Sequence, residues 1–174
     1  LYIIVSNLKM RIRTMKKVLF ALIGIATLAF VGCDDDYTPS TSLNQAFSDR
    51  YPNATHVEWE RERGHRVAEF HFNGQECEAW YTASGKWVMT LFDIKYSDLP
   101  AAVKTAFETE FGVEAPIDDV ERLERNTGEI IYIIDTEQVV NGFLTDIYLD
   151  YAEDGTLLRN EVEREWGEHI YYYL

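Results

Sequence analysis

The chain has 174 residues, of which 47% are hydrophobic, 14% aromatic and 26% charged, a composition typical of one or two small globular domains. Its 30 acidic and 16 basic residues give a net charge of −14, and such a polyanion repels phosphate backbones and anionic lipid headgroups. We therefore expect neither nucleic-acid binding nor docking on a membrane through a basic face. Two cysteines are too few for a disulfide scaffold.

The opening segment, 1–32, has the layout of a secretory signal. Met15-Lys16-Lys17 begins a basic stretch, and the apolar run 18–31 follows it. This run is shorter than the roughly 20 residues that a membrane helix needs. A glycine precedes Cys33, as at the cleavage site of bacterial lipoproteins, although Phe30 stands where leucine is usual. We predict an upstream extension before Met15, a signal peptide and lipidation of Cys33; the alternative is an uncleaved membrane helix.

Residues 33–41 are predicted to be a short tether between the lipid and the folded part. Asp34-Asp35-Asp36 resembles the acidic export tag of Bacteroidota lipoproteins, which directs them to the outer membrane, facing the periplasm or the cell surface. In enteric bacteria an aspartate at this place indicates retention in the inner membrane instead. We expect a cell-envelope protein that touches the membrane only through its lipid anchor.

A first structural unit is predicted over 42–95. Apolar residues at helical spacing predict a helix over 42–51, which begins with a capping box of Ser42 and Gln45. Segments of alternating polarity predict the strands that follow it, at 55–61, 65–72, 75–82 and 86–92, with Asn73-Gly74 as a tight hairpin turn.

A second unit over 96–165 repeats this order. Its helix is predicted over 97–111, with Ser97 or Asp98 as the N-cap and Gly112 as the terminator. Its strands are predicted at 118–124, 129–137, 143–151 and 156–163, and an aromatic tail, 166–174, follows. The sequence thus predicts an α+β fold: a tandem repeat of a helix plus a four-stranded antiparallel meander, with the helices on one face of the sheet.

Motifs of the folded part resemble the PepSY-like lipoproteins of Bacteroidota, also described as beta-lactamase-inhibitor-like. The resemblance covers 43–163 and rests on Tyr51-Pro52-x-Ala54, Val57-x-Trp59, Ala79-Trp80-Tyr81, Gly85-Lys86-Trp87 and Asp98-Leu99-Pro100. It implies the inhibitor fold, in which two such units form a concave sheet surface that grips a partner enzyme. It also implies an inhibitor or regulator of a secreted enzyme, although no inhibitory loop can be matched residue by residue.

Strand alternation predicts two different faces for the sheet. An offset of 70 aligns two rows that we expect to be buried under the helices: Cys77, Ala79 and Tyr81 with Ile147, Leu149 and Tyr151, and Val88 and Phe92 with Leu158 and Val162. The alternate residues of the second unit form a mostly solvated set: Tyr148, Asp150, Leu157, Arg159 and Glu161.

The corresponding residues of the first unit form a candidate patch for binding another envelope or secreted protein. Its members are Trp80, Trp87, Met89 and Leu91, with Glu78, Glu69 and His71 as a charged rim. Two alternatives stay open for this patch: the tail covers it or forms a dimer contact, or a one-residue slip in register exchanges the two faces. Because paired tryptophans also stack on sugar rings, a glycan or small-ligand site is an alternative function.

Catalytic and metal-binding motifs are sparse, and we predict no enzyme activity, metal or cofactor. Cys77 lies in a buried row without a basic neighbour, so we interpret it as a core thiol. His65, Glu69 and His71 share one side of a strand and need a ligand from another strand to hold Zn²⁺. Asp118-Asp119 is interpreted as a loop pair. A hydrolase that uses His71 and the carboxylates is the third hypothesis.

Overall fold

A computed structural model describes residues 37–140, 142–162 and 168–174. The chain separates into a unit over 1–34 and a compact unit over 35–174, and the described residues all belong to the second. The predicted signal peptide, the lipidation site Cys33, the acidic stretch Asp34-Asp35-Asp36 and Trp166 therefore lie outside the described residues.

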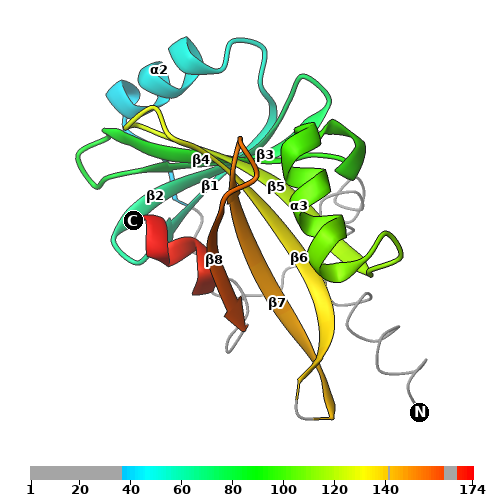
Figure 1. Cartoon of the computed structure of the whole chain (residues 1–174). Helices are drawn as coiled ribbons and strands as arrows, with labels where there is room; N and C mark the ends of the chain where they lie inside the picture. Colours follow the sequence, from blue (N-terminus) through cyan, green and yellow to red (C-terminus); the bar gives the residue numbers. More distant parts are fainter. Residues whose placement is uncertain (1–36, 141, 163–167) are drawn as a thin grey trace, which may run out of the picture. The chain divides into compact units, whose positions relative to one another are not determined.

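Each of two helices is followed by four strands (Figure 1). The elements of the first half are α2 (Thr41–Arg50), β1 (Thr55–Glu62), β2 (His65–Phe72), β3 (Gln75–Tyr81) and β4 (Trp87–Asp93). A 3-10 turn, η1 (Tyr96–Asp98), leads into the second half: α3 (Ala101–Phe111), β5 (Ile117–Arg125), β6 (Ile130–Val140), β7 (Phe143–Ala152) and β8 (Leu157–Val162). A second 3-10 helix, η2 (Glu168–Tyr173), comes last.

The strands form one eight-stranded antiparallel sheet in chain order. β4 pairs with β5, so the two meanders are continuous. The predicted α+β class and the predicted strands are confirmed, the strands to within a few residues at their ends. Asn73 (φ 53°) and Gly74 (φ 82°) both adopt positive φ in the β2–β3 turn, as a two-residue type I′ turn requires.

Both helices begin differently from the prediction. In α2 the N-cap is Ser40, whose Oγ accepts a hydrogen bond from the Leu43 amide at 3.2 Å, so the predicted capping box at Ser42 is wrong. In α3 the N-cap is Pro100, and no side chain caps the helix. The predicted N-cap residues Ser97 and Asp98 belong to η1 instead. Gly112, with φ 86°, ends α3 as predicted.

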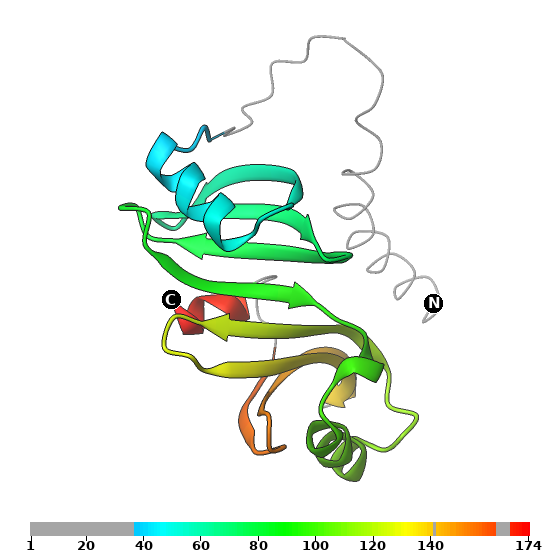
Figure 2. The ribbon, with the colours of Figure 1, turned by 90° about the horizontal axis from the view of Figure 1, so that it is seen from above.

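One face of the sheet, called the helix face, carries a large apolar cluster that includes residues of both helices. Leu43 and Phe47 of α2 and Val103 and Phe107 of α3 are buried in it. The predicted row is also there: Cys77, Ala79, Tyr81, Ile147, Leu149 and Tyr151. Figure 2 shows α2 against the first strands and α3 beside the later ones. Burial raises the pKa of the Cys77 thiol to about 12, which fits a core residue.

Equivalent turns contact the two helices. Gly85, in the β3–β4 turn, lies below Leu43 of α2, where an added Cβ would be 3.8 Å from Leu43 Cδ1. Gly155, in the β7–β8 turn, lies closer to α3: an added Cβ would be 2.6 Å from the Ala102 carbonyl oxygen. The position therefore requires glycine for space as well as for its φ of 84°.

A β-bulge in β4 changes the face of one predicted patch residue. Trp80 pairs with Met89 and Tyr81 pairs with Trp87, so Val88 is an extra residue. Trp87 therefore packs on the helix face and Val88 on the opposite face, and the predicted faces of both residues are wrong. Arg50 lies over the Trp87 ring, with its Cζ 3.2 Å from the ring centroid.

β8 has a bulge at the equivalent position and is exposed. Asp150 pairs with Arg159 and Tyr151 with Leu157, which leaves Leu158 as the extra residue. Leu158 is 49% exposed and Val162 is 40% exposed, so the prediction that both are buried is wrong. Since β8 is at the edge of the sheet, its side chains have packing partners on fewer sides.

Candidate protein-binding face

The sheet face opposite the helices, called the tail face, has an apolar centre that is itself buried. This tail cluster spans both halves of the sheet and includes one residue of η2; its members are Val67, Trp80, Met89, Leu91, Leu123, Ile131, Ile133, Tyr148 and Tyr173. Trp80 is 1% exposed and Leu91 is 3% exposed. Tyr173 belongs to this cluster and Ile170 packs against it, so part of the tail lies on the patch.

The residues predicted as the patch and its rim are brought together, apart from Trp87. Val67 pairs with Trp80, Glu69 with Glu78 and His71 with Glu76, so these residues share the tail face in the predicted register. The indole Nε1 of Trp80 donates a hydrogen bond to Oε1 of Glu78. The predicted core of the patch is thus correctly located, but it is not the open apolar surface that alternation alone suggested.

Carboxylates lie beside this apolar centre, on β1, β2 and β3. Glu58, Glu69 and Glu78 are direct cross-strand neighbours, so three acidic side chains form one row on the tail face. Like charges in such a row repel one another. Burial and the charges of Glu69, Glu121 and Glu62 raise the pKa of Glu78 to about 8, despite the hydrogen bond from Trp80.

A buried carboxylate lies beneath the tail. Asp150 is fully buried, and its Oδ2 accepts hydrogen bonds from Arg159 Nε, at 2.6 Å, and from the hydroxyl of Tyr173. Tyr148 is also buried, at 5% exposure, so the prediction of a mostly solvated set is wrong for Tyr148 and Asp150, whereas Leu157 and Glu161 are exposed as predicted. We call this site around Tyr173, with Asp150 at its base, the seat. Sequence reasoning missed it because an acidic residue at an outward strand position is normally exposed to solvent. The residue that covers it could not be identified from the strand pattern.

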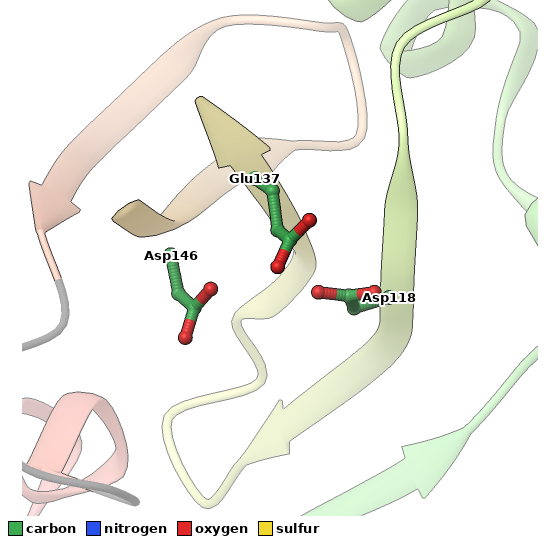
Figure 3. A group of neighbouring side chains, drawn as sticks. All are labelled: Asp118, Glu137 and Asp146. Carbon is green, nitrogen blue, oxygen red and sulfur yellow. The ribbon is translucent and has the colours of Figure 1, made fainter. Parts of the chain in front are cut away.

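The predicted zinc spacing does not form a metal site among the described residues. His65, Glu69 and His71 are not brought together as a group, and His71 Nε2 lies 3.8 Å from Glu76 Oε1 in an exposed pair. A different acidic group does form: the carboxylates of Asp118, Glu137 and Asp146 lie within 4.8 Å of one another (Figure 3).

Asp118 belongs to β5, as the predicted strand over 118–124 has it, so the interpretation of Asp118-Asp119 as a loop pair is wrong. The strand register shifts between Ile117, which lies opposite Thr136, and Asp119, which lies opposite Asp135, so Asp118 occupies an irregularity of the β5–β6 ladder. Acidic side chains gather in this way in many proteins without a metal, so we assign no ion to the group.

No described helix combines the length and apolarity needed to cross a membrane.

Comparisons with known proteins agree with this architecture. A "BLIP-like protein" from Bacteroides fragilis is 31% identical, with a TM-score of 0.68, over 78% of this chain and 96% of its own. A "DUF2874 family protein" from Bacteroides ovatus is 28% identical, with a TM-score of 0.66, over 72% of this chain and 89% of its own.

A third solved structure, from Bacteroides eggerthii and described as "putative periplasmic proteins", is 26% identical, with a TM-score of 0.66. It covers the same shares, 72% of this chain and 89% of its own. No curated protein matches the chain. A family described as "Putative beta-lactamase-inhibitor-like, PepSY-like" matches residues 64–159. The chain therefore belongs to this PepSY-like, beta-lactamase-inhibitor-like family.

Proposed function

We propose that the protein is a lipid-anchored, non-enzymatic binding module of the cell envelope, which recognises another envelope or secreted protein through the tail face. In this proposal Cys33 carries the lipid, and two helix-plus-four-strand repeats provide the sheet. The partner contacts the rim of Glu69, His71 and Glu78, around an apolar centre of Trp80, Met89 and Leu91 that is buried in this structure, while Trp87 supports the sheet from the helix face.

The observation that carries this proposal is the composition of the tail face. Apolar residues from β2 to β7 form a continuous centre, and a row of carboxylates lies beside it on β1 to β3. An apolar centre with a polar rim is the usual anatomy of a protein interface. The solved B. fragilis relative is described as BLIP-like, and the family description also names inhibitor-like proteins, which supports binding of a protein.

The envelope location is supported by the sequence and by one relative. The basic and apolar leader ends at a lipobox-like Gly32-Cys33, and the B. eggerthii structure is described as "putative periplasmic proteins". Metabolic labelling with a fatty acid tests the anchor. Label should be present in the wild-type chain and absent from Cys33→Ala, and labelling of both chains would contradict the lipidation site.

Site-specific photo-crosslinking in the native envelope tests the binding face. A crosslinking amino acid at Glu58 or His71 reports on the tail face, and the same group at Glu110, exposed on α3, is the matched control. We expect the same envelope protein to be captured from both tail-face positions and not from the α3 position. Equal capture from all three positions would contradict recognition through the tail face.

The glycan alternative depended on two tryptophans side by side on one face. Because Trp80 lies in the tail cluster and Trp87 packs against the helix cluster, the two indoles lie on opposite faces of the sheet. The pair therefore cannot stack together on one sugar, and the protein-binding proposal is the one that the geometry favours.

A further inference from the structure

The C-terminal segment 168–174, called the tail segment, inserts one side chain into the tail face and leaves others outside it. Tyr173 is 4% exposed and belongs to the tail cluster, and Ile170 packs against the same cluster. Tyr172 is 71% exposed and Leu174 is 40% exposed. Figures 1 and 2 show η2 away from both α2 and α3.

Polar contacts hold Tyr173 in a defined seat. Its hydroxyl donates to Asp150 Oδ2, and Arg125 Nη2 donates to its carbonyl oxygen at 3.1 Å. The Arg159 guanidinium, itself paired with Asp150, has its Cζ 5.4 Å from the centroid of the Tyr173 ring. Burial and the charge of Asp150 raise the pKa of Tyr173, so its hydroxyl remains a donor at neutral pH.

The tail segment is held at this seat without strand pairing. η2 has six residues and is not a strand of the sheet, so sheet hydrogen bonds do not hold it in place. A helix of this length is not stable in isolation and depends on the surface that it covers. Such segments open at a lower free energy than the global unfolding of a domain.

We propose that the tail segment is a built-in occupant of the partner-binding face, and that a protein partner binds by replacing it with a segment that carries a tyrosine. The inference rests on the proposed function, because it places the partner on the tail face. The partner's aromatic ring would fill the place of the Tyr173 ring, and its phenol would donate to Asp150.

The chemistry of the seat selects this kind of partner. When the tail segment leaves, Asp150 loses one donor, and the apolar side chains around Tyr173 lose their cover. An aliphatic residue would restore the apolar contact but would leave the carboxylate without that donor. A loss of this kind is costly for a buried charged group, so a phenol on an apolar ring is the replacement that satisfies both needs.

The test uses the compact unit 35–174 and a labelled synthetic peptide with the sequence of residues 168–174. Binding is measured by fluorescence anisotropy to the wild-type chain, to Tyr173→Ala and to the control Tyr172→Ala, whose side chain is exposed in the folded chain. We expect Tyr173→Ala, with its seat vacated, to bind the peptide at least tenfold more tightly than the other two chains. Circular dichroism verifies that all three are folded.

A second peptide isolates the hydrogen bond to Asp150. Tyr173→Phe in the peptide keeps the ring and removes the hydroxyl, and we expect roughly tenfold to hundredfold weaker binding, the range for a hydrogen bond to a charged group. If Tyr173→Ala is not folded, Tyr173→Phe in the chain replaces it, and it should admit the wild-type peptide better than the wild-type chain does. Equal binding by the chains, or by the two peptides, overturns the inference.

The outcome can be separated from that of the proposed function, since the peptide assay needs no natural partner. Absence of the expected peptide binding, with an envelope protein still crosslinked at Glu58 and His71, overturns the tail-segment inference alone. Peptide binding as expected, with no specific crosslinking, leaves the seat in place and refutes the proposed function. Equal crosslinking by wild type and Tyr173→Ala would also exclude displacement of the tail segment.

Discussion

Removal of the Glu78 carboxylate should change how the stability of the protein depends on pH. Glu78 is half-buried on the tail face, where burial and the charges of Glu69, Glu121 and Glu62 raise its pKa from 4.5 to about 8. The folded state therefore favours protonated Glu78, whereas in the unfolded state the group ionises near its ordinary pKa. The stability of the fold with protonated Glu78, relative to the fold with ionised Glu78, is fully present below about pH 4.5 and is lost as the pH rises through about 8.

The size of the effect follows from the shift. Each pKa unit corresponds to about 1.4 kcal/mol, so the whole shift has an upper limit of about 5 kcal/mol. Solvent reaches part of the side chain and screens these charges, and we expect about 2 kcal/mol to remain. In Glu78→Gln the side chain is neutral at every pH and can still accept the Trp80 hydrogen bond. The variant should match wild type near pH 4.5 and exceed its free energy of unfolding by this amount at pH 8.

Urea denaturation at several pH values between 4.5 and 8.5 measures this difference. Glu76→Gln is the matched control, because it removes a carboxylate from the same strand and the same face where the side chain is 50% exposed. We expect the control to follow wild type at each pH. The reasoning is refuted if Glu78→Gln is less stable than wild type at pH 8, or if Glu76→Gln changes the pH dependence to the same extent.

Three further substitutions test the packing around the two faces. Gly155→Ala brings a Cβ within 2.6 Å of the Ala102 carbonyl oxygen. Gly128 has a similar φ of 85° but open space around it, so Gly128→Ala is the matched control. Thermal unfolding should show Gly155→Ala to be less stable than Gly128→Ala by about 1–3 kcal/mol. Thr90→Val removes the buried hydroxyl that bonds to the Tyr51 hydroxyl and accepts from Trp87 Nε1 at 2.8 Å, and chemical denaturation should show a loss of about 1–3 kcal/mol. A smaller loss than for Thr109→Val, on the exposed side of α3, would contradict this account. Asp150→Ala removes the buried partner of Arg159 and should lower the free energy of unfolding by about 3–5 kcal/mol. Glu161→Gln, which changes the exposed partner of the same arginine, should lower it by less than about 1 kcal/mol. Similar losses for the two variants would show that the Asp150 seat is not structurally important.

The sequence was sufficient to predict the sheet because its strands have local signals. Alternating polarity and turn glycines located every strand, and the 70-residue offset correctly placed Ala79 and Leu149 in the same buried cluster. A bulge has no comparable signal, since one extra residue leaves the composition of the strand unchanged. The face of Trp87 was therefore mispredicted, although its neighbour Trp80 was placed on the correct face.

The helix N-termini and the tail segment show a second limit of local reasoning. Ser40 and Ser42 are both good N-cap residues, and only the path of the chain into α2 decides between them. Asp150 looks solvated in a strand pattern because the covering residue, Tyr173, is 23 positions away in the chain. The tandem repeat itself stays a prediction, which the matching bulges at Val88 and Leu158 support.

The two faces of the sheet differ in a way that stability alone does not explain. On the helix face the apolar residues form one large cluster, the buried hydroxyl of Thr90 has hydrogen-bond partners, and the charged Arg122 pairs with Glu124. On the tail face, Glu58, Glu69 and Glu78 are direct neighbours; repulsion between two ionised neighbours costs up to about 1 kcal/mol, and the charge of Glu69 helps to raise the pKa of Glu78 to about 8. A sequence selected for stability would place opposite charges in this row. Proteins keep unfavourable arrangements of this kind where function requires them, so the acidic row supports the proposal that a partner binds the tail face and not the helix face.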